Sequence, residues 1–145
     1  MILTEQDIIN TYNKRQQEQS SLYLQYQEIK KQNPESGYKR ISKELKQPLH
    51  KTRWWHSKKH IPTPIQTVNW LKQRSLIPLE ENNQKLHLIA KILGTTFGDG
   101  GIFQNLNGIF LSSSELSTIE EFKKDIKQIF GNELDSNSRI IEGGE

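Results

Sequence analysis

Hydrophobic residues recur at helical spacing through the first 79 positions, and polar breaks divide them into short segments. Leu22, Tyr26 and Ile29 lie three or four positions apart, which predicts a helix that ends near Asn33-Pro34. After it come a short helix over residues 38–45, a turn over 47–49, a second short helix over 50–59 and a fourth helix that contains Val68, Leu71 and Leu76-Ile77. This part of the chain is therefore expected to be all-helical.

The first 20 residues are interpreted as an N-terminal helix or linker. Leu3, Ile8, Ile9 and Tyr12 fit a short amphipathic helix. Residues 13–21 are almost entirely polar, and both a solvated helical extension and a loose linker fit them. The expected domain boundaries are 1–20 for this segment, 21–79 for a helical domain and 84–145 for a second domain, with a polar boundary at 78–83.

After this boundary the hydrophobic pattern predicts both helices and strands. An apolar helix is expected from about Gln84 to Asp99, and Asn82 or Asn83 is its candidate cap. Two short β-prone runs follow at 102–103 and 108–111, joined by an Asn-Gly hairpin signal. Leu116, Ile119, Phe122, Ile126, Ile129 and Phe130 then predict an amphipathic helix, with a capping box at Ser117 and Glu120 and a C-cap at Gly131. A further strand is expected over 138–141, which gives the order α-β-β-α-β and an α+β fold class for the whole chain.

Charge is divided unevenly along the chain. Residues 1–79 contain 14 Lys/Arg against six Asp/Glu, a net charge of +8, whereas residues 80–145 contain six against 11, a net charge of −5. The window 38–60 holds eight basic residues and only Glu44 as an acid. Such a basic region favours a nucleic-acid partner. A solvated, lysine-rich surface is the plainer interpretation.

Composition excludes several kinds of site. The chain has no cysteine, so disulfides and thiolate metal sites are excluded, and its four histidines lack zinc-site spacing. It shows no long apolar run or basic-then-apolar leader, so no membrane partner is expected. The expected location is cytoplasmic, associated with the nucleoid.

The basic window resembles a helix-turn-helix domain. In that class the second helix lies in the major groove of duplex DNA. Gln47-Pro48 replaces the usual glycine in the turn, and one of Trp54 and Trp55 is expected to pack inward, as is Trp70. Plain core packing of both residues of the Trp54-Trp55 pair remains an alternative. The candidate DNA contacts here are Lys39, Arg40, Lys51, Thr52, Arg53, Lys58 and Lys59.

The segment Ile92–Gly101 carries the most distinctive chemistry. Gly94 and Gly98 are four residues apart, so they share one stripe of a helix and would let another backbone approach closely. Asp99 ends the stripe. A second copy of the helix would bring two carboxylates together, which is one way to hold Mg²⁺ against a phosphate.

Residues 92–100 resemble the LAGLIDADG signature of homing endonucleases, particularly archaeal and intein-borne members. Gly94 and Gly100 fall on the two family glycines and Asp99 on the metal-binding acid, whereas threonines occupy two apolar positions and Phe97 replaces an aspartate. The order α-β-β-α-β matches the first five elements of that fold. The expected fold is therefore an all-α helix-turn-helix domain followed by an incomplete LAGLIDADG unit, apparently truncated at its C-terminus.

The resemblance implies an enzyme, a site-specific endonuclease that cleaves double-stranded DNA with Mg²⁺. It implies Asp99 as the catalytic metal ligand, assisted by the Gly98 carbonyl, and Gln104, Asn105 and Asn107 as base-reading residues on the sheet. The single signature implies a homodimer or a second LAGLIDADG repeat, with Gly94 and Gly98 at the helix interface. The alternative is a non-cleaving transcriptional regulator or RNA maturase on the same scaffold. A plain helix-turn-helix factor would leave the glycine–aspartate stripe unexplained, and Asp99 could also be an ordinary turn acid.

Overall fold

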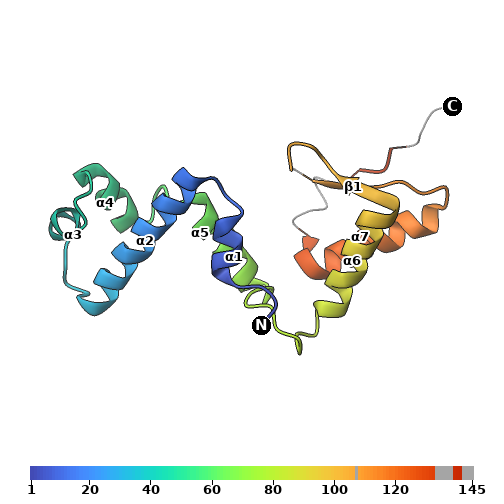
Figure 1. Ribbon diagram of the computed structural model, residues 1–145, viewed down its shortest axis with the longest axis horizontal. Coiled ribbons are helices and arrows are strands. Elements are labelled where there is room, and N and C mark those ends of the chain that lie inside the picture. Colours follow the sequence, from blue (N-terminus) through green and yellow to red (C-terminus); the bar gives the residue numbers. More distant parts are fainter. Residues whose placement is uncertain (107, 133–138, 142–145) are drawn as a thin grey trace. The chain divides into compact units, whose positions relative to one another are not determined.

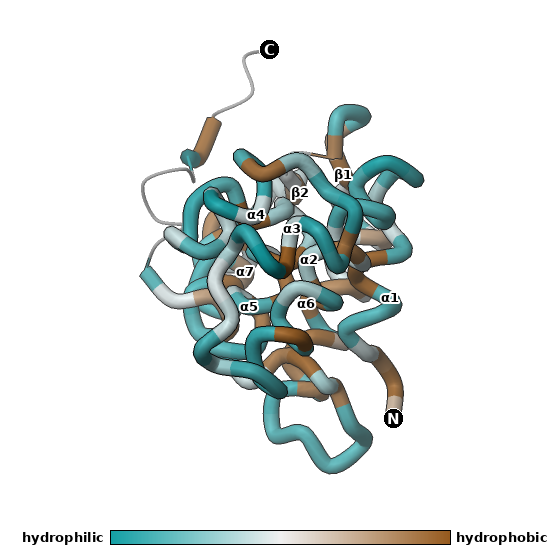
Figure 2. The backbone as a smooth tube through the Cα atoms, turned by 90° about the vertical axis from the view of Figure 1, so that its left-hand side faces the viewer, coloured by the Kyte–Doolittle hydropathy of each residue, from teal (hydrophilic) through white to brown (hydrophobic). Residues whose placement is uncertain are grey.

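A computed structural model describes residues 1–106, 108–132 and 139–141. The chain divides into two compact units, Met1–Leu79 and Glu80–Glu145, and each is described by itself. Within the described residues the chain is mostly helical with one small antiparallel sheet, so the α+β class holds in general terms. No helix in these ranges is both long and apolar enough to cross a bilayer, and Figure 2 shows hydrophobic residues only in short runs.

The first unit is built from five helices. They are α1 (Glu5–Asn10), α2 (Lys14–Gln32), α3 (Tyr38–Glu44), α4 (Leu49–His56) and α5 (Thr63–Gln73). The long helix α2 runs through the unit, with α3 and α4 at its C-terminal end and α1 and α5 at the other (Figure 1). Leu3 and Leu79 form an isolated antiparallel bridge, which ties the start of the unit to its last residue.

Side-chain caps decide where the first two helices begin. Thr4 and Asp7 form a capping box at α1, with the Thr4 Oγ1 accepting from the Asp7 backbone N–H at 3.2 Å. The Asn13 side chain accepts from the Gln16 backbone N–H at 3.0 Å and caps α2. Of the two interpretations of the polar stretch 13–21, the helical extension is therefore the observed one.

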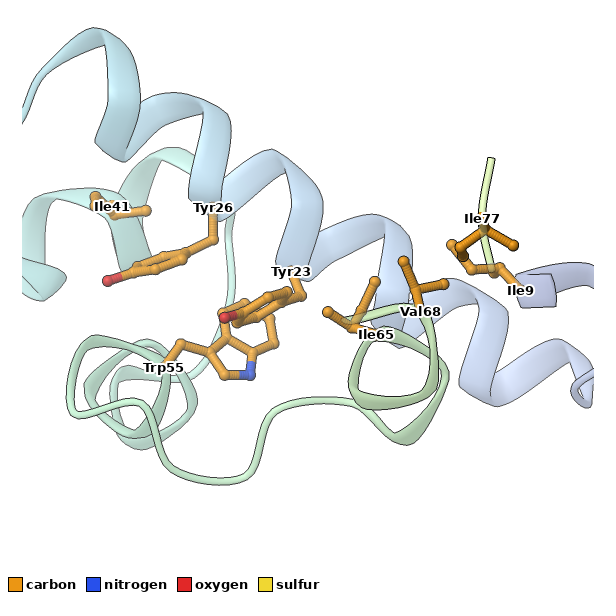
Figure 3. Close-up of a cluster of buried hydrophobic side chains, with 8 residues drawn as sticks. All are labelled: Ile9, Tyr23, Tyr26, Ile41, Trp55, Ile65, Val68 and Ile77. Carbon is orange, nitrogen blue, oxygen red and sulfur yellow. The ribbon is translucent and has the colours of Figure 1, made fainter. Parts of the chain in front are cut away.

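An aromatic cluster joins α2 to α4 in the core. The Trp55 ring lies 5.5 Å from that of Tyr23 and 5.7 Å from that of Tyr26, measured between centroids (Figure 3). Burial raises the pKa of both tyrosines above its ordinary value. The other buried members of this core are Ile9, Ile41, Ile65, Val68 and Ile77.

The tryptophans divide as the helical pattern predicts, with one exception. Trp55 is 4% exposed whereas Trp54 is 41% exposed, which confirms that one of the pair packs inward. Trp70, expected in the core, is only partly buried. Its ring stacks under the Arg74 guanidinium, whose carbon lies 3.8 Å from the ring centroid, because the two residues are one helical turn apart at the end of α5.

The second unit packs two helices and a hairpin. It contains α6 (Leu86–Asp99), β1 (Gly100–Ile102), β2 (Ile109–Leu111) and α7 (Leu116–Phe130), and β1 pairs with β2 from Gly100↔Leu111 to Ile102↔Ile109. The inner face of α6 buries Leu88, Ile92 and Thr96. Across the helix pair, Lys91 binds Glu121 at 2.6 Å and the buried Asp125 at 2.7 Å, and these two carboxylates, Asp125 first, raise the pKa of Lys91.

Of four local predictions for this unit, three need correction. The capping box at Ser117 is wrong, because α7 already begins at Leu116 with Glu115 as its N-cap; instead the Ser113 hydroxyl accepts from the Glu115 N–H. Residues 139–141 belong to no strand, so the strand predicted over 138–141 is not formed there, and residue 138 lies outside the described ranges. The cap predicted at Asn82 or Asn83 is also wrong, because Lys85 is the N-cap of α6 and makes no side-chain cap hydrogen bond, although the Asn83 side chain accepts from the Lys85 N–H at 2.9 Å. The C-cap predicted at Gly131 is confirmed.

Trp55→Ala should destabilise the first unit strongly, by about 3–5 kcal/mol, because it leaves a cavity between the two tyrosines. Trp54→Ala is the matched control and should cost no more than about 1 kcal/mol, as expected for an exposed side chain. All three tryptophans of the chain lie in the first unit. In each variant, the fluorescence of the two remaining tryptophans therefore reports the urea unfolding of this unit alone. Equal losses for the two variants would contradict the observed orientation of α4.

Candidate nucleic-acid interface and acidic helix end

A tight turn joins the end of α3 at Glu44 to the start of α4 at Leu49. The Ser42 hydroxyl donates to the Gln47 carbonyl at 2.7 Å, and the Gln47 N–H donates back to the Ser42 carbonyl at 3.0 Å. Lys46 takes φ 51°, the left-handed conformation that a glycine adopts most easily. The turn therefore forms without glycine because two hydrogen bonds hold it.

The outward face of α4 carries His50, Arg53 and Trp54. These residues are spaced i, i+3 and i+4 and are all exposed, whereas Thr52 and Trp55 point inward. With Leu49 and with Tyr38 of α3, the outward residues line a shallow groove. This groove is the surface that α4 offers to a partner.

Thr52 is not a DNA contact. It was expected to face the partner, but its exposed fraction is 0% and its hydroxyl donates to the Leu49 carbonyl at 3.1 Å. The orientation of Trp55 explains the error, because residues three apart share a helix face and Thr52 must turn inward with it.

Lys51 is only partly available for a phosphate contact. Its Nζ donates to the Gln47 Oε1 at 3.0 Å and lies 5.3 Å from the centroid of the buried Trp55 ring. Desolvation by burial lowers the pKa of this lysine below its ordinary value. We therefore assign it mainly to bracing the turn against α4.

The other predicted basic contacts are exposed. Lys39 and Arg40 lie in the first turn of α3, Arg53 lies on α4, and Lys58 and Lys59 follow the end of α4. These five exposed cations on and after α3 and α4 provide the kind of charge that contacts to phosphate require.

Sequence reasoning missed the setting of Trp54. The His50 ring lies 4.9 Å from the Trp54 ring and the His60 ring 4.5 Å from it, between centroids. The spacing of the four histidines argues against a zinc site and does not predict these ring contacts. The i, i+4 relation of His50 to Trp54 could have revealed one contact, but the contact with His60 depends on the chain turning back after α4.

Asp99 ends α6 as an exposed side chain at the junction with β1. Its backbone carbonyl accepts from the Ser112 N–H at 3.0 Å, which anchors the helix end to the segment after β2. Glycine is required directly after it, because a Cβ at Gly100 would lie 2.0 Å from the Phe110 carbonyl oxygen. The close approach of β2 therefore explains Gly100.

Gly94 and Gly98 have no such explanation within the described residues. Both are exposed, and a Cβ built at either position would meet nothing within 4 Å. On the same side of α6, Leu93 is 49% exposed and Phe97 72% exposed. This outer face of α6 therefore carries apolar side chains and glycines that the described residues of its own unit leave exposed.

On the opposite face of α6, Thr95 and Thr96 differ in burial and in hydrogen bonding. Thr95 donates its hydroxyl to the Lys91 carbonyl at 2.9 Å. Thr96 is 2% exposed, and its hydroxyl has no hydrogen-bond partner in the described residues. Thr96 therefore occupies an apolar position of the helix, where a buried hydroxyl without a partner costs about 1–3 kcal/mol.

One chain does not fit a magnesium site by itself. Asp99 stands as a single exposed carboxylate, and no group of three or more His, Cys, Asp or Glu residues gathers anywhere in the described ranges. Mg²⁺ needs near-octahedral oxygen ligands. The Asp99 carboxylate and the Gly98 carbonyl supply too few of them, so we derive no catalytic step from this chain alone.

The residues predicted to read bases from the sheet lie in the β1–β2 connection. Gln104 and Asn105 are exposed there, and Asn107 lies outside the described residues. Around them Phe103 and Phe110 pack together with centroids 5.4 Å apart, yet they remain 51% and 44% exposed. A two-stranded sheet with such open rings is not stable on its own and depends on α6 behind it.

Comparison with known proteins gives short, partial similarities. The chain is 36% identical over 63 residues to a DNA-directed RNA polymerase subunit, Rpo1N, of Methanocaldococcus jannaschii, 38% over 61 residues to the archaeal Lon protease of Pyrococcus abyssi and 34% over 64 residues to the tRNA-splicing ligase RtcB of Pyrococcus horikoshii. These segments are 42–44% of this chain but only 5–7% of those proteins. No family model and no solved structure matches the chain.

The exposed cations around α4 should give salt-sensitive binding to duplex DNA. Log K should fall linearly with log salt concentration, by about 0.9 for each phosphate contact, because binding releases counterions. Lys58→Ala and Lys59→Ala should each remove one phosphate contact and so reduce the magnitude of that slope by about 0.9. Lys14→Ala, an exposed lysine at the far end of α2, should leave it unchanged. A folded chain without salt-sensitive binding would refute the interface.

Proposed function

We propose that this chain supplies the DNA-binding module and one LAGLIDADG-type half of a site-specific homing endonuclease. In this proposal the first unit binds duplex DNA through α3 and α4. The second unit presents α6 to another LAGLIDADG-type helix, from a second copy of the chain or a second repeat. Pairing would bring Asp99 beside its counterpart, where the two carboxylates would hold Mg²⁺ for phosphodiester hydrolysis inside the cell.

The single observation that carries this proposal is the uncovered glycine stripe of α6. Gly94 and Gly98 face open space and Asp99 directly follows the stripe. Each helical glycine costs about 1 kcal/mol relative to alanine, so two of them without a neighbour in their own unit need an external reason. A second backbone in close contact supplies that reason.

The comparisons support the view that part of this chain is a separable module. Segments of similar length match a polymerase subunit, a protease and a ligase, which are unrelated in activity. Matches of 61–64 residues that make up only 5–7% of each protein are better explained by an inserted unit than by part of three different catalytic centres. Insertion into unrelated hosts is the behaviour expected of intein-borne or otherwise mobile homing endonucleases.

A non-cleaving DNA-binding regulator or RNA maturase on the same scaffold is the second candidate. The observation that favours it is the lone carboxylate, since one Asp99 per unit does not complete a metal site. A regulator would still need the basic face of α3 and α4, and it would need α6 to pair. It would not need the charge of Asp99, and this difference separates the two candidates.

Gly98→Leu should abolish pairing without harming the fold. A side chain there meets nothing in its own unit, and leucine favours a helix over glycine by about 1 kcal/mol, so melting should be unchanged or slightly raised. Sedimentation equilibrium should show a concentration-dependent dimer for the wild-type chain and only monomer for the variant. Gly100→Leu is the contrasting variant and should unfold the hairpin. Normal pairing by a folded Gly98→Leu would show that this face is not the interface.

Asp99→Asn should abolish Mg²⁺-dependent cleavage by the complete gene product while DNA binding changes little. Asparagine keeps the shape but removes the negative charge that a hard dication prefers, whereas affinity comes largely from cations elsewhere. Cleavage and binding are compared on one target with and without Mg²⁺, and Glu120→Gln serves as the control at an exposed carboxylate on α7. Equal cleavage by the Asp99 variant would remove Asp99 from catalysis, and a wild type that binds specifically without cutting would favour the regulator.

A further inference from the structure

The groove on α4 is more apolar than a phosphate-binding surface requires. Leu49 is 47% exposed and Trp54 is 41% exposed, and with Tyr38 they line the same groove. Leaving an aliphatic and an indole side chain in water sacrifices hydrophobic burial that a matching apolar partner would restore. The groove therefore needs a partner with an apolar group as well as charge.

Trp54 is held in place before any partner arrives. His50 meets the indole edge at an interplanar angle of 68°, and His60 lies against it at 42°. The Lys59 N–H donates to the Trp54 carbonyl at 2.7 Å and folds the following segment back toward the ring. A ring braced on two sides loses little rotamer freedom on binding.

Arg53 brings a guanidinium to the same groove. None of the described carboxylates forms an ion pair with it, so its donors are not committed to another side chain's charge. It lies one helical turn from Leu49, and their Cβ atoms are thus about 5–6 Å apart. Adjacent base pairs in a duplex are about 3.4 Å apart, so the two side chains can reach neighbouring bases.

The major groove of DNA offers one apolar group, the C5-methyl of thymine, and guanine offers N7 and O6 to a bidentate arginine. We propose that Leu49 and Trp54 bind a thymine methyl while Arg53 binds the adjacent guanine, so that α4 selects a thymine–guanine step in duplex DNA. This inference rests on the proposed DNA-binding function of the first unit. It names specificity residues, Leu49 and Trp54, that lie outside the basic set expected from the sequence.

The experiment selects duplexes from a randomised pool with the full chain and then alters single groups in the selected duplex. The enriched duplexes should share a thymine–guanine step. Replacing that thymine by uracil removes only the methyl and should weaken binding roughly fourfold, equivalent to about 0.8 kcal/mol. Replacing the guanine by 7-deazaguanine removes the N7 acceptor and should weaken binding roughly tenfold.

Variants then show which side chains read which group. Leu49→Ala and Trp54→Ala should bind the thymine and uracil duplexes equally, and Arg53→Ala should bind the guanine and 7-deazaguanine duplexes equally. Leu24→Ala is the matched control, because Leu24 is 41% exposed on α2 and lies outside the groove; it should keep both discriminations. Circular dichroism melting shows that each variant is folded.

The following results would overturn the proposal. Duplex binding without a shared thymine–guanine step, or equal binding of uracil and thymine duplexes by the wild type, refutes the base assignment and leaves the DNA-binding function standing. Preference for an RNA duplex of the selected sequence refutes it too, since RNA lacks the methyl. If the chain shows no salt-sensitive binding to any duplex, both the inference and the DNA-binding function are refuted.

Discussion

The packing of Trp55 against Tyr23 and Tyr26 sets the rotation of α4, and the surface of the first unit depends on that rotation. Each residue turns an α-helix by about 100°, so an inward Trp55 also turns Thr52 inward and His50, Arg53 and Trp54 outward. A change of one residue in this orientation would bury Arg53 or Trp54 and expose Thr52. The aromatic cluster of the core thus decides which side chains a partner meets.

The second unit depends in the same way on the two faces of α6. One face buries Leu88, Ile92 and Thr96, and the ion pairs of Lys91 with Glu121 and Asp125 join α6 to α7. The other face keeps Gly94, Gly98 and Phe97 exposed. The buried face of α6 already packs within its own unit. Gly94 and Gly98, on the exposed face, are therefore available for a contact that the unit itself does not make.

The two units divide the properties that the proposed function requires. The first carries net positive charge and, on α3 and α4, a groove that combines apolar and cationic side chains. The second carries net negative charge, and Asp99 is the carboxylate at the end of α6, whose outer face is exposed. Affinity for DNA would therefore reside mainly in one unit, whereas any chemistry would need two copies of the other.

The sequence by itself determined the order of the main helices and the place of the hairpin, because hydrophobic spacing and glycines act over a few residues. It did not determine where α6 and α7 begin, since their predicted caps are wrong, and it predicted a strand that residues 139–141 do not form. Tertiary packing decided the rest. It turned Thr52 into the core, drew Lys51 against Trp55, left Trp70 partly exposed and placed His60 beside Trp54. The close approach of β2 requires a glycine at position 100, whereas nothing within the second unit requires a glycine at positions 94 and 98. These outcomes depend on contacts between segments far apart in the chain, and local spacing carries no information about such contacts.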